Sequence, residues 1–282
     1  RVLVIGGSRG MTGAPRLAAL GALRAGAGLV HLALPGGAAH EAGGAPPEFM
    51  TRAIGRGPFF TADDVEAVLA LMEAVRPQAM ALGPGLGRDA GTAAMVRALL
   101  ARPSRPPCVV DADALYALRP NASAGEEDPS GLLSPSDIIT PHPGEAAALL
   151  PERFFAQRAG TDGRSAKGVQ DRRPDALAAL IEACGAVVAL KGAGTLVGRR
   201  GKPVVLCPTA TAALAVGGSG DVLAGVIAAK AASGMASFDA ACLGVHLHAR
   251  AGELLENRAP GGHLAGEIAS AVPLAWKELC AP

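Results

Sequence analysis

The sequence predicts an α/β fold with a mostly parallel central sheet covered by helices on both faces. Short apolar runs alternate along the chain with longer segments of helical periodicity. The runs are almost continuously apolar, as in strands buried on both faces, rather than alternating as in half-exposed strands. Five of these runs are followed directly by glycine-rich or polar clusters. Together these observations favour a wound sheet with its functional loops at one edge.

The apolar runs place the strands in chain order. We expect strands at residues 2–5, 29–34, 79–82, 108–110, 137–140, 186–190, 196–197 and 204–207. The longer amphipathic or buried patterns predict helices at residues 14–25, 62–75, 90–101, 174–184, 220–232, 238–256 and 264–279. No internal repeat interrupts this alternation.

We expect residues 1–282 to form a single domain. Two stretches, 121–136 and 157–173, are rich in serine, glycine, proline and charged residues and lack apolar periodicity. They predict mobile loops within the domain rather than linkers between domains.

Composition excludes several classes of protein. The formal net charge of +1 and the aromatic content of 3% provide neither the basic surface nor the stacking platform of a nucleic-acid-binding protein. The most apolar stretch, 212–229, contains Asp221 and several glycines, so we interpret it as core rather than as a membrane span. Five widely spaced cysteines without a C-x-x-C pair, and no signal-peptide pattern, predict a reducing cytoplasm.

The clusters that follow the strands predict a single ligand cleft. They begin at Gly6, Gly83, Asp111, Pro141 and Lys191, each directly after an expected strand. Ligands of open α/β sheets bind outside the carboxyl ends of the strands, and parallel strands all end at the same edge.

The segment Gly217-Gly218-Ser219-Gly220-Asp221 indicates phosphate chemistry. It precedes an apolar helix, so free backbone N–H groups and the positive helix end would lie beside one carboxylate. Asp221 is then placed to accept a proton from a hydroxyl that attacks a phosphoryl group. The alternative is an aspartate N-cap after a glycine turn.

The cluster Lys191-Gly192-Ala193-Gly194-Thr195 suits contact with nucleotide phosphates, although a lysine at a strand end is often only a solvated charge. No G-x-x-x-x-G-K-[ST] or G-x-G-x-x-G motif occurs, which excludes a P-loop or a dinucleotide-binding Rossmann site. Asp111 and Asp113 are as easily turn residues as functional ones. We interpret His246 and His248 as structural, whereas His142, between two prolines, is a candidate for a positioned group.

Seven segments in order carry a family resemblance over nearly the whole chain. They read SRGMTGA (8–14), LRAGAGLV (23–30), LGPGLGRD (82–89), VVDADAL (109–115), TPHPGEAAALL (140–150), LKGAGTLV (190–197) and GGSGDVLAG (217–225). This set closely resembles the NAD(P)H-hydrate dehydratases of the ribokinase-like superfamily. GSGD recurs across ribokinase-like kinases, whereas the combination of TPHPGE, LRAGAGLV and GPGLG is much more specific.

The resemblance implies a three-layer α/β/α sandwich and a metabolite-repair lyase. Such enzymes use ADP or ATP with Mg²⁺ to dehydrate the S epimer of NADHX or NADPHX and restore NADH or NADPH. Phosphorylation of the hydrate hydroxyl followed by loss of phosphate is the implied route. The resemblance also implies a homotetramer and an epimerase partner, as a domain or a separate protein, which this sequence does not contain.

Carried over by position, Asp221 resembles the catalytic carboxylate and also contacts the hydrate. The nucleotide would bind at Lys191 to Thr195 and at Gly218, Ser219 and Gly220. Contacts with the hydrated dinucleotide are implied for Ala14, Gly85 or Gly87, and His142. Glu145 resembles the acid that holds magnesium in this superfamily, through water.

Three positions depart from the family pattern. Met11 stands where the family has a tyrosine-like residue, and Tyr116 where asparagine is common. Ala210-Thr211-Ala212 replaces part of a segment that usually reads close to N-P-T-G-N-P, which predicts a different nucleotide-base pocket or loop. Two alternatives therefore stay open: a small-molecule kinase of the hydroxyethylthiazole-kinase type, or a non-catalytic nucleotide-binding relative.

Overall fold

The computed structural model describes residues 1–44, 48–119, 129–156 and 164–280. The strands are β1 (Val2–Ile5), β2 (Val30–Pro35), β3 (Met50–Ile54), β4 (Ala79–Leu82), β5 (Cys108–Val110), β6 (Ile138–Ile139), β7 (Val187–Leu190), β8 (Leu196–Gly198) and β9 (Val205–Leu206). The α-helices are α1 (Gly13–Arg24), α2 (Val65–Val75), α3 (Ala90–Leu100), α4 (Asp113–Ala117), α5 (Pro143–Leu149), α6 (Glu152–Ala156), α7 (Ala166–Gln170), α8 (Arg173–Cys184), α9 (Ser219–Ala232), α10 (Ser237–Glu256) and α11 (Ala265–Leu279).

The strands form one sheet in the order β3-β2-β1-β4-β5-β6-β7-β8-β9. Every pairing from β3 to β7 is parallel, and β8 and β9 continue the sheet antiparallel. The strand order changes direction at β1, which lies between β2 and β4. Crevices at such a switch point are where open α/β sheets bind ligands.

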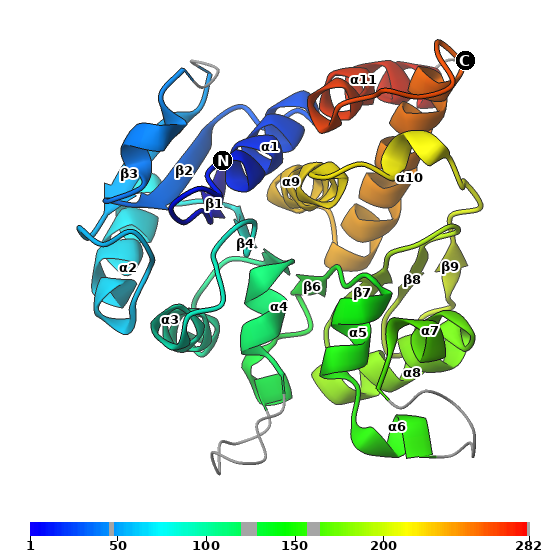
Figure 1. The fold of residues 1–282 in the computed structure, drawn as a ribbon, viewed down its shortest axis with the longest axis horizontal. Helices are drawn as coiled ribbons and strands as arrows, with labels where there is room; N and C mark the ends of the chain where they lie inside the picture. Colours follow the sequence, from blue (N-terminus) through cyan, green and yellow to red (C-terminus); the bar gives the residue numbers. More distant parts are fainter. Residues whose placement is uncertain (45–47, 120–128, 157–163, 281–282) are drawn as a thin grey trace.

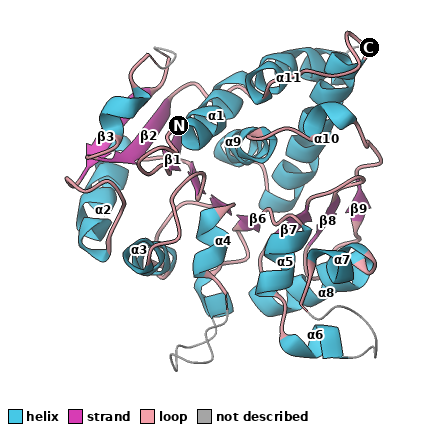
Figure 2. Cartoon of the chain, in the orientation of Figure 1, coloured by secondary structure: helices cyan, strands magenta, loops and turns pink. Residues whose placement is uncertain are grey.

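Helices cover both faces of the sheet, so the expected three-layer arrangement is confirmed (Figures 1 and 2). Val2 and Val4 of β1 belong to a core shared with α1, α9, α10 and α11. Leu3 and Ile5 of the same strand point to the opposite core, which includes residues of α2, α3, α4, α5 and α8. The alternation follows from the two-residue period of a strand, and it explains why β1 is apolar throughout.

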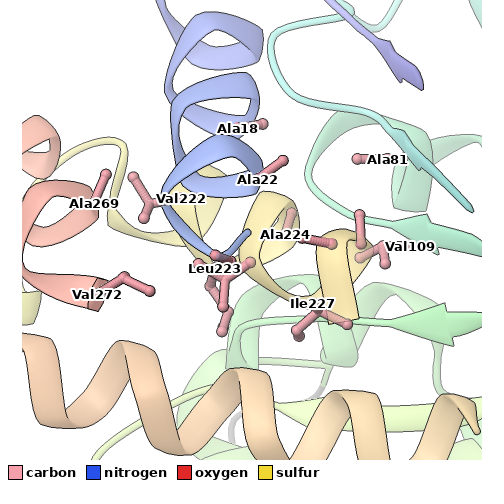
Figure 3. Packing of buried hydrophobic residues seen from close by; sticks show 14 of the residues in the cluster. Ala18, Ala22, Ala81, Val109, Val222, Leu223, Ala224, Ile227, Ala269 and Val272 are labelled. Atoms are coloured by element: carbon pink, nitrogen blue, oxygen red, sulfur yellow. The ribbon is translucent and has the colours of Figure 1, made fainter. Parts of the chain in front are cut away.

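Helix α9 is the centre of one layer and carries the GGSGD segment at its start. It packs against α1, α10 and α11 and against the strands β4 and β5. Figure 3 shows Ala18 and Ala22 of α1 beside the α9 residues Val222 and Ala224. A Cβ at Gly225 would lie 1.8 Å from the carbonyl oxygen of Ala18, so only glycine permits this approach of the two backbones. The close packing fixes the start of α9 relative to the sheet.

All eight expected strands are present, with ends within two residues of the prediction, and each of the seven expected helices has its counterpart. The prediction missed β3, an edge strand of sequence MTRAI with only Ile54 buried, because it lacks an apolar run. It also missed the short helices α4 and α5, each seven residues or fewer.

The expected loop at 157–173 is wrong in its second half. Residues 157–163 lie outside the described residues, but Ala166–Gln170 form α7 and Arg173 begins α8. The Ser165 hydroxyl accepts a hydrogen bond from the Gly168 amide and Val169 is fully buried, so a cap and an apolar anchor order this segment. Of the other expected loop, 121–128 lie outside the described residues and Pro129–Leu132 form a 3₁₀ turn.

In the described parts of the chain, no helix combines the length and the apolar character that crossing a bilayer requires. All five cysteines are described, and none forms a disulfide.

Candidate active site

The parallel topology brings the five loop clusters to one edge of the sheet, as the sequence predicted. The loops after β1 and β4 interlock there. The Gly7 amide donates to the Pro84 carbonyl oxygen at 2.8 Å, and the Ser8 hydroxyl donates to the Gly85 carbonyl oxygen at 3.0 Å. These bonds join the loop after β1, at the switch point, to the loop after the neighbouring strand β4.

A buried ion pair joins the ends of β5 and β7. Asp111 is 1% exposed, and it accepts hydrogen bonds from Lys191 Nζ at 2.6 Å and from Thr140 Oγ1 at 2.7 Å. Burial disfavours the charged ammonium, but the carboxylates of Asp111 and Glu145 outweigh this effect and raise the pKa of Lys191. Lys191 is therefore a fixed positive charge at the cleft and not a solvated surface lysine.

Asp221 lies in the first turn of α9, and its pKa is raised to about 7. Burial is the main cause, the nearby negative charge of Asp111 adds to it, and the Lys191 ammonium opposes both. A carboxyl group with a pKa near neutrality can accept or release a proton at physiological pH.

The start of α9 and the side chain of Lys191 lie next to each other at the cleft. Gly218 precedes the helix with a φ of 89°, in the left-handed region that favours glycine. Its backbone conformation makes the turn that leads into α9. A Cβ at Gly220 would lie 3.2 Å from Lys191 Nζ, which places the ammonium over the first helical turn. Amides of a first turn lack intrahelical acceptors, and here they face the same space as a fixed cation.

His142 and Glu145 form the start of α5. The amides of Gly144 and Glu145 donate to His142 Nδ1 at 3.0 and 3.3 Å, and the His142 amide donates to Glu145 Oε2 at 2.8 Å. With Nδ1 accepting these bonds, the proton of a neutral ring is on Nε2, which lies 3.3 Å from Glu145 Oε1. Glu145 also lies 3.7 Å from Lys191 Nζ, so it links the histidine to the cation.

A cavity of about 610 Å³ opens between the Lys191 loop and the start of α9, and we call it the large cavity. Its volume is in the range of sites for nucleotide-sized ligands. Its walls combine polar groups at the α9 end with small apolar side chains elsewhere. They include Gly192, Ala193, Thr195, Ser219 and Gly220 of the predicted nucleotide contacts, together with Lys191, His142, Leu223 and residues 209–212.

The departure at Ala210-Thr211-Ala212 lies in the wall of the large cavity. The Thr209 hydroxyl donates to Glu253 at 2.9 Å, and the Thr211 hydroxyl donates to Glu256; both acceptors belong to α10. Two threonine–glutamate bonds thus hold the loop against α10. The residues that differ from the family pattern are therefore ordered, and the cavity that they line is present next to Asp221 and Lys191.

The residues expected to contact the dinucleotide divide into two groups. His142 lines both the large cavity and a smaller one of about 190 Å³, which we call the small cavity. Ala14 and Gly85 lie together, since a Cβ at Gly85 would be 3.2 Å from Ala14 Cβ, and the Gly87 amide donates to Asp113 at 3.0 Å. Within the described residues these three line neither cavity.

Other predicted residues act on the architecture of the site. Gly194 and Gly218 shape turns and are absent from the large-cavity wall as far as the chain is described. His248 is buried, and its Nε2 lies 3.1 Å from Ser219 Oγ and 2.9 Å from the Ser219 carbonyl oxygen. Burial lowers the pKa of His248 to about 4, so a neutral ring supports the start of α9, in keeping with the structural role expected for it.

Sequence reasoning missed Arg173 and the partnership of Asp111. Arg173 donates to the carbonyl oxygens of Ala193 at 2.6 Å and Leu190 at 3.1 Å, and these two hydrogen bonds hold the Lys191 loop in place. It carries no motif, and no pattern could have revealed it. The sequence marked Asp111 as a candidate because it belongs to the D-A-D segment. Its partner Lys191 could not be inferred, because it lies 80 residues away in the sequence. Between the aspartates, Ala112 has a φ of 50°, a strained conformation that turns them to different partners.

The mostly parallel sheet with helices on both faces is a ribokinase-like fold. The chain superposes on ribokinase from Thermotoga maritima with a TM-score of 0.55 and 14% identity, covering 98% of this chain and 99% of that one. At this identity the likeness shows the fold alone.

The chain belongs to the NAD(P)H-hydrate dehydratase family, whose profile matches residues 2–274. It is 37% identical over 282 residues to the bifunctional NAD(P)H-hydrate repair enzyme of Moorella thermoacetica, covering 99% of this chain and 49% of that one. It is 34% identical over 270 residues to the ADP-dependent (S)-NAD(P)H-hydrate dehydratase of Neisseria meningitidis, covering 95% and 82%. The chain thus spans about half the length of the bifunctional relatives it matches.

A solved structure supports the same assignment. It is the ADP/ATP-dependent NAD(P)H-hydrate dehydratase of Bacillus subtilis, co-crystallised with ATP and Mg²⁺. The TM-score is 0.75 at 25% identity, and the superposition covers 98% of this chain and 88% of that one.

Proposed function

We propose that this chain dehydrates the S epimer of NADHX or NADPHX to NADH or NADPH, with ADP or ATP as phosphoryl donor. The observation that carries the proposal is Asp221, a carboxyl group with a pKa of about 7 in the first turn of α9 and next to Lys191. Membership of the dehydratase family supports it. Asp221 is the proposed catalytic residue.

The donor nucleotide would occupy the large cavity. Its phosphates would meet the ammonium of Lys191 and the amides that begin α9, and Gly192 to Thr195 would follow the polyphosphate. Arg173 would keep this loop in place through its bonds to Leu190 and Ala193. The neighbouring carboxylates raise the pKa of Lys191 in spite of its burial, so its ammonium would be charged near neutral pH.

The hydrate hydroxyl would attack the terminal phosphoryl group of the donor while Asp221 accepts its proton. The new O–P bond forms as the bond from phosphorus to the donor's bridging oxygen breaks, which releases AMP from ADP or ADP from ATP. Hydroxide is a poor leaving group, whereas phosphate is a good one. The phosphate then departs with the C–O electron pair, a neighbouring carbon loses a proton, and the ring double bond returns.

Magnesium fits this site as a companion of the nucleotide and not as a resident ion. Among the described residues, no group of three or more His, Cys, Asp or Glu side chains could enclose a metal. Glu145 already accepts the His142 amide and lies near Lys191, so it would hold the ion through water. When bound, Mg²⁺ neutralises phosphate charge in the transition state.

The hydrated nicotinamide would approach from the β1 and β4 loops, with contacts at Ala14, Gly85 or Gly87, and His142. The Nε2–H of His142 faces Glu145 Oε1 at 3.3 Å, so the hydrate would contact the ring that this pair holds in the cavity wall. Its position in the walls of both cavities suits a residue between donor and acceptor.

We further propose a single domain over 1–282, a homotetramer, a cytoplasmic location and an epimerase as partner. One sheet that runs from Val2 to Leu206 supports the single domain, and five unpaired cysteines agree with a reducing compartment. Bifunctional relatives of about twice the matched length are in keeping with an epimerase partner.

The test is recovery of dihydronicotinamide absorbance when the chain is mixed with NADHX or NADPHX, Mg²⁺ and either ADP or ATP. Recovery with one nucleotide identifies both the reaction and its donor. A stable phosphorylated product without recovery would instead indicate a small-molecule kinase. Nucleotide binding without any turnover would indicate a non-catalytic relative.

A further inference from the structure

The loop after β4, Gly83-Pro84-Gly85-Leu86-Gly87, contains proposed contacts for the hydrate, and we call it the glycine loop. Its three glycines have φ values of 131°, 63° and 80°, in the region that favours glycine. Glycine also loses more conformational freedom on folding than any other residue. Such a loop therefore keeps one conformation only where neighbouring elements hold it.

Two neighbouring segments hold the first part of the glycine loop. The loop after β1 donates hydrogen bonds to the carbonyl oxygens of Pro84 and Gly85. The backbone of Asp111 packs so closely against Gly83 that a Cβ there would lie 1.7 Å from the Asp111 carbonyl oxygen. These contacts fix the glycine loop from Gly83 to Gly85.

Asp113 holds the last part of the glycine loop. Its Oδ2 accepts a hydrogen bond from the Gly87 amide at 3.0 Å, and its Oδ1 accepts one from Arg88 Nε at 2.8 Å. The Asp113 side chain is only 14% exposed, and hydrogen bonds to a carboxylate are stronger where little water competes for them. One carboxylate thus binds two consecutive residues at the point where the glycine loop ends.

The same short segment holds the donor side of the site. Asp111 accepts a hydrogen bond from Lys191 Nζ at 2.6 Å, and only Ala112 separates Asp111 from Asp113. Ala112 has a φ of 50° and a ψ of −123°, outside the regions open to residues that carry a side chain. A strained backbone of this kind persists only where its surroundings impose it, and such residues cluster at functional sites. The conformation of Ala112 directs the two carboxylates to different partners.

Asp113 also contributes to the electrostatics of the reacting group. Burial is the main cause of the raised pKa of Asp221, followed by the negative charge of Asp111. Lys191 opposes both effects, and the negative charges of Asp113 and Glu145 add smaller increases. The carboxylate of Asp113 therefore lies close enough for its charge to act on the proposed catalytic residue.

We propose that Asp113 is a positioning residue for the hydrate: it holds the end of the glycine loop in the conformation that receives the hydrated nicotinamide, while Asp111 holds Lys191 for the nucleotide phosphates. This inference rests on the proposed function. Asp113 acts through the glycine loop and not by contact with the substrate. The segment 111–113 thereby fixes the acceptor side of the site relative to the donor side.

The test measures KM for the hydrate and for the nucleotide in the full chain with Asp113→Ala and with Asp113→Asn. Asp113→Ala should raise KM for the hydrate about tenfold or more, because both hydrogen bonds to the end of the glycine loop are lost. Asp113→Asn keeps one acceptor oxygen, so its rise should be smaller. KM for the nucleotide should change less than about twofold in both variants, since Asp111 still holds Lys191.

Glu66→Gln is the matched control, because Glu66 also accepts a hydrogen bond from an arginine but lies on the exposed surface, 3.0 Å from Arg102. This control should match the wild type in both KM values, and circular dichroism checks the folding of all variants. Unchanged KM for the hydrate, or an equal rise in both KM values, overturns the inference. Asp113→Asn decides the question if Asp113→Ala does not fold.

The pH profile distinguishes positioning at the site from a merely structural role of Asp113 at the start of α4. Loss of its negative charge lowers the pKa of Asp221, so the profile of kcat/KM for Asp113→Asn should move to lower pH. The other charges that act on this carboxyl, those of Asp111, Glu145 and Lys191, are unchanged in the variant. The control variant should leave the profile in place. A profile of Asp113→Asn that coincides with that of the wild type assigns Asp113 a structural role only and overturns the inference.

Hydrogen–deuterium exchange separates this inference from the proposed function. If the wild type restores neither NADH nor NADPH, the proposed function fails, and the exchange of residues 82–89 is then compared without ligands. Faster exchange of this segment in Asp113→Ala than in the wild type, with unchanged exchange of residues 190–197, supports the positioning role. Equal exchange at 82–89, or a similar increase in both segments, overturns it.

Discussion

Turnover should depend on pH through the ionisation of Asp221. Burial and the negative charge of Asp111 raise the pKa of this carboxyl to about 7, well above the usual range of an aspartate. Only the carboxylate can accept the hydroxyl proton, so activity is lost as pH falls through 7 and is gained as it rises. An ordinary aspartate would be fully ionised over this range and would give no such dependence.

The expected size follows from the fraction of carboxylate. With a pKa of 7, about a tenth of Asp221 is ionised at pH 6, half at pH 7 and about nine-tenths at pH 8. The value of kcat/KM should therefore rise about fivefold from pH 6 to pH 7 and just under twofold from pH 7 to pH 8. Lys191 lowers this pKa, so Lys191→Met should move the profile to higher pH.

The assay is the initial rate of absorbance recovery under saturating nucleotide, with the rate without enzyme subtracted at each pH. Asp221→Asn should reduce kcat by a factor of about 10² to 10⁴, as expected for loss of a general base, with nearly unchanged nucleotide affinity. A flat wild-type profile between pH 6 and pH 8, or near-normal turnover by Asp221→Asn, would refute the assignment.

Three further outcomes are expected. Lys191→Ala should raise the nucleotide dissociation constant about tenfold or more in calorimetry, because it removes the cation over the first turn of α9, and it should change hydrate binding little. Equal nucleotide affinity of the variant and the wild type would count against this role of Lys191. Gly225→Ala should lower the free energy of unfolding by about 1–3 kcal/mol or more in denaturant titration, since its Cβ would overlap the Ala18 carbonyl oxygen. Gly266→Ala in α11, where a Cβ would meet no neighbour, should be neutral or stabilising. Equal stability of the two variants would contradict the close packing of α9 against α1. Asp137→Asn should lower the free energy of unfolding by about 3–5 kcal/mol in the same titration, because it leaves the buried guanidinium of Arg105, 2.6 Å away, without its charge partner. A decrease below about 1 kcal/mol would be inconsistent with this role of Asp137.

The sheet could be predicted from sequence because its inner strands are continuous apolar runs, and several of them are followed in the sequence by glycine-rich or polar clusters. β1 and β4 have the predicted bounds, residue for residue. β3 could not be predicted, because an edge strand with four partly or fully exposed residues needs no apolar run. Helix α7 was hidden for a similar reason, since a serine cap and one buried valine order it.

The candidate site was predictable where one short segment carries the chemistry. GGSGD indicates a helix start with a carboxylate, and Asp221 lies in the first turn of α9. The pairing of Lys191 with Asp111 joins strands 80 residues apart, and the brace from Arg173 depends on where α8 packs. Such contacts arise from tertiary structure, which local patterns do not encode.

Nucleotide-dependent dehydration is tested most directly by the stoichiometry between nucleotide consumed and dihydronicotinamide restored. Purified chain, Mg²⁺, hydrate and ADP are incubated, and AMP is quantified by chromatography beside the absorbance recovery, with ATP and ADP release measured in parallel. Phosphoryl transfer to the hydrate predicts one nucleotide cleaved for each NADH or NADPH restored, and neither product with Asp221→Asn. Restoration of dihydronicotinamide without nucleotide cleavage would contradict phosphoryl transfer as the first step.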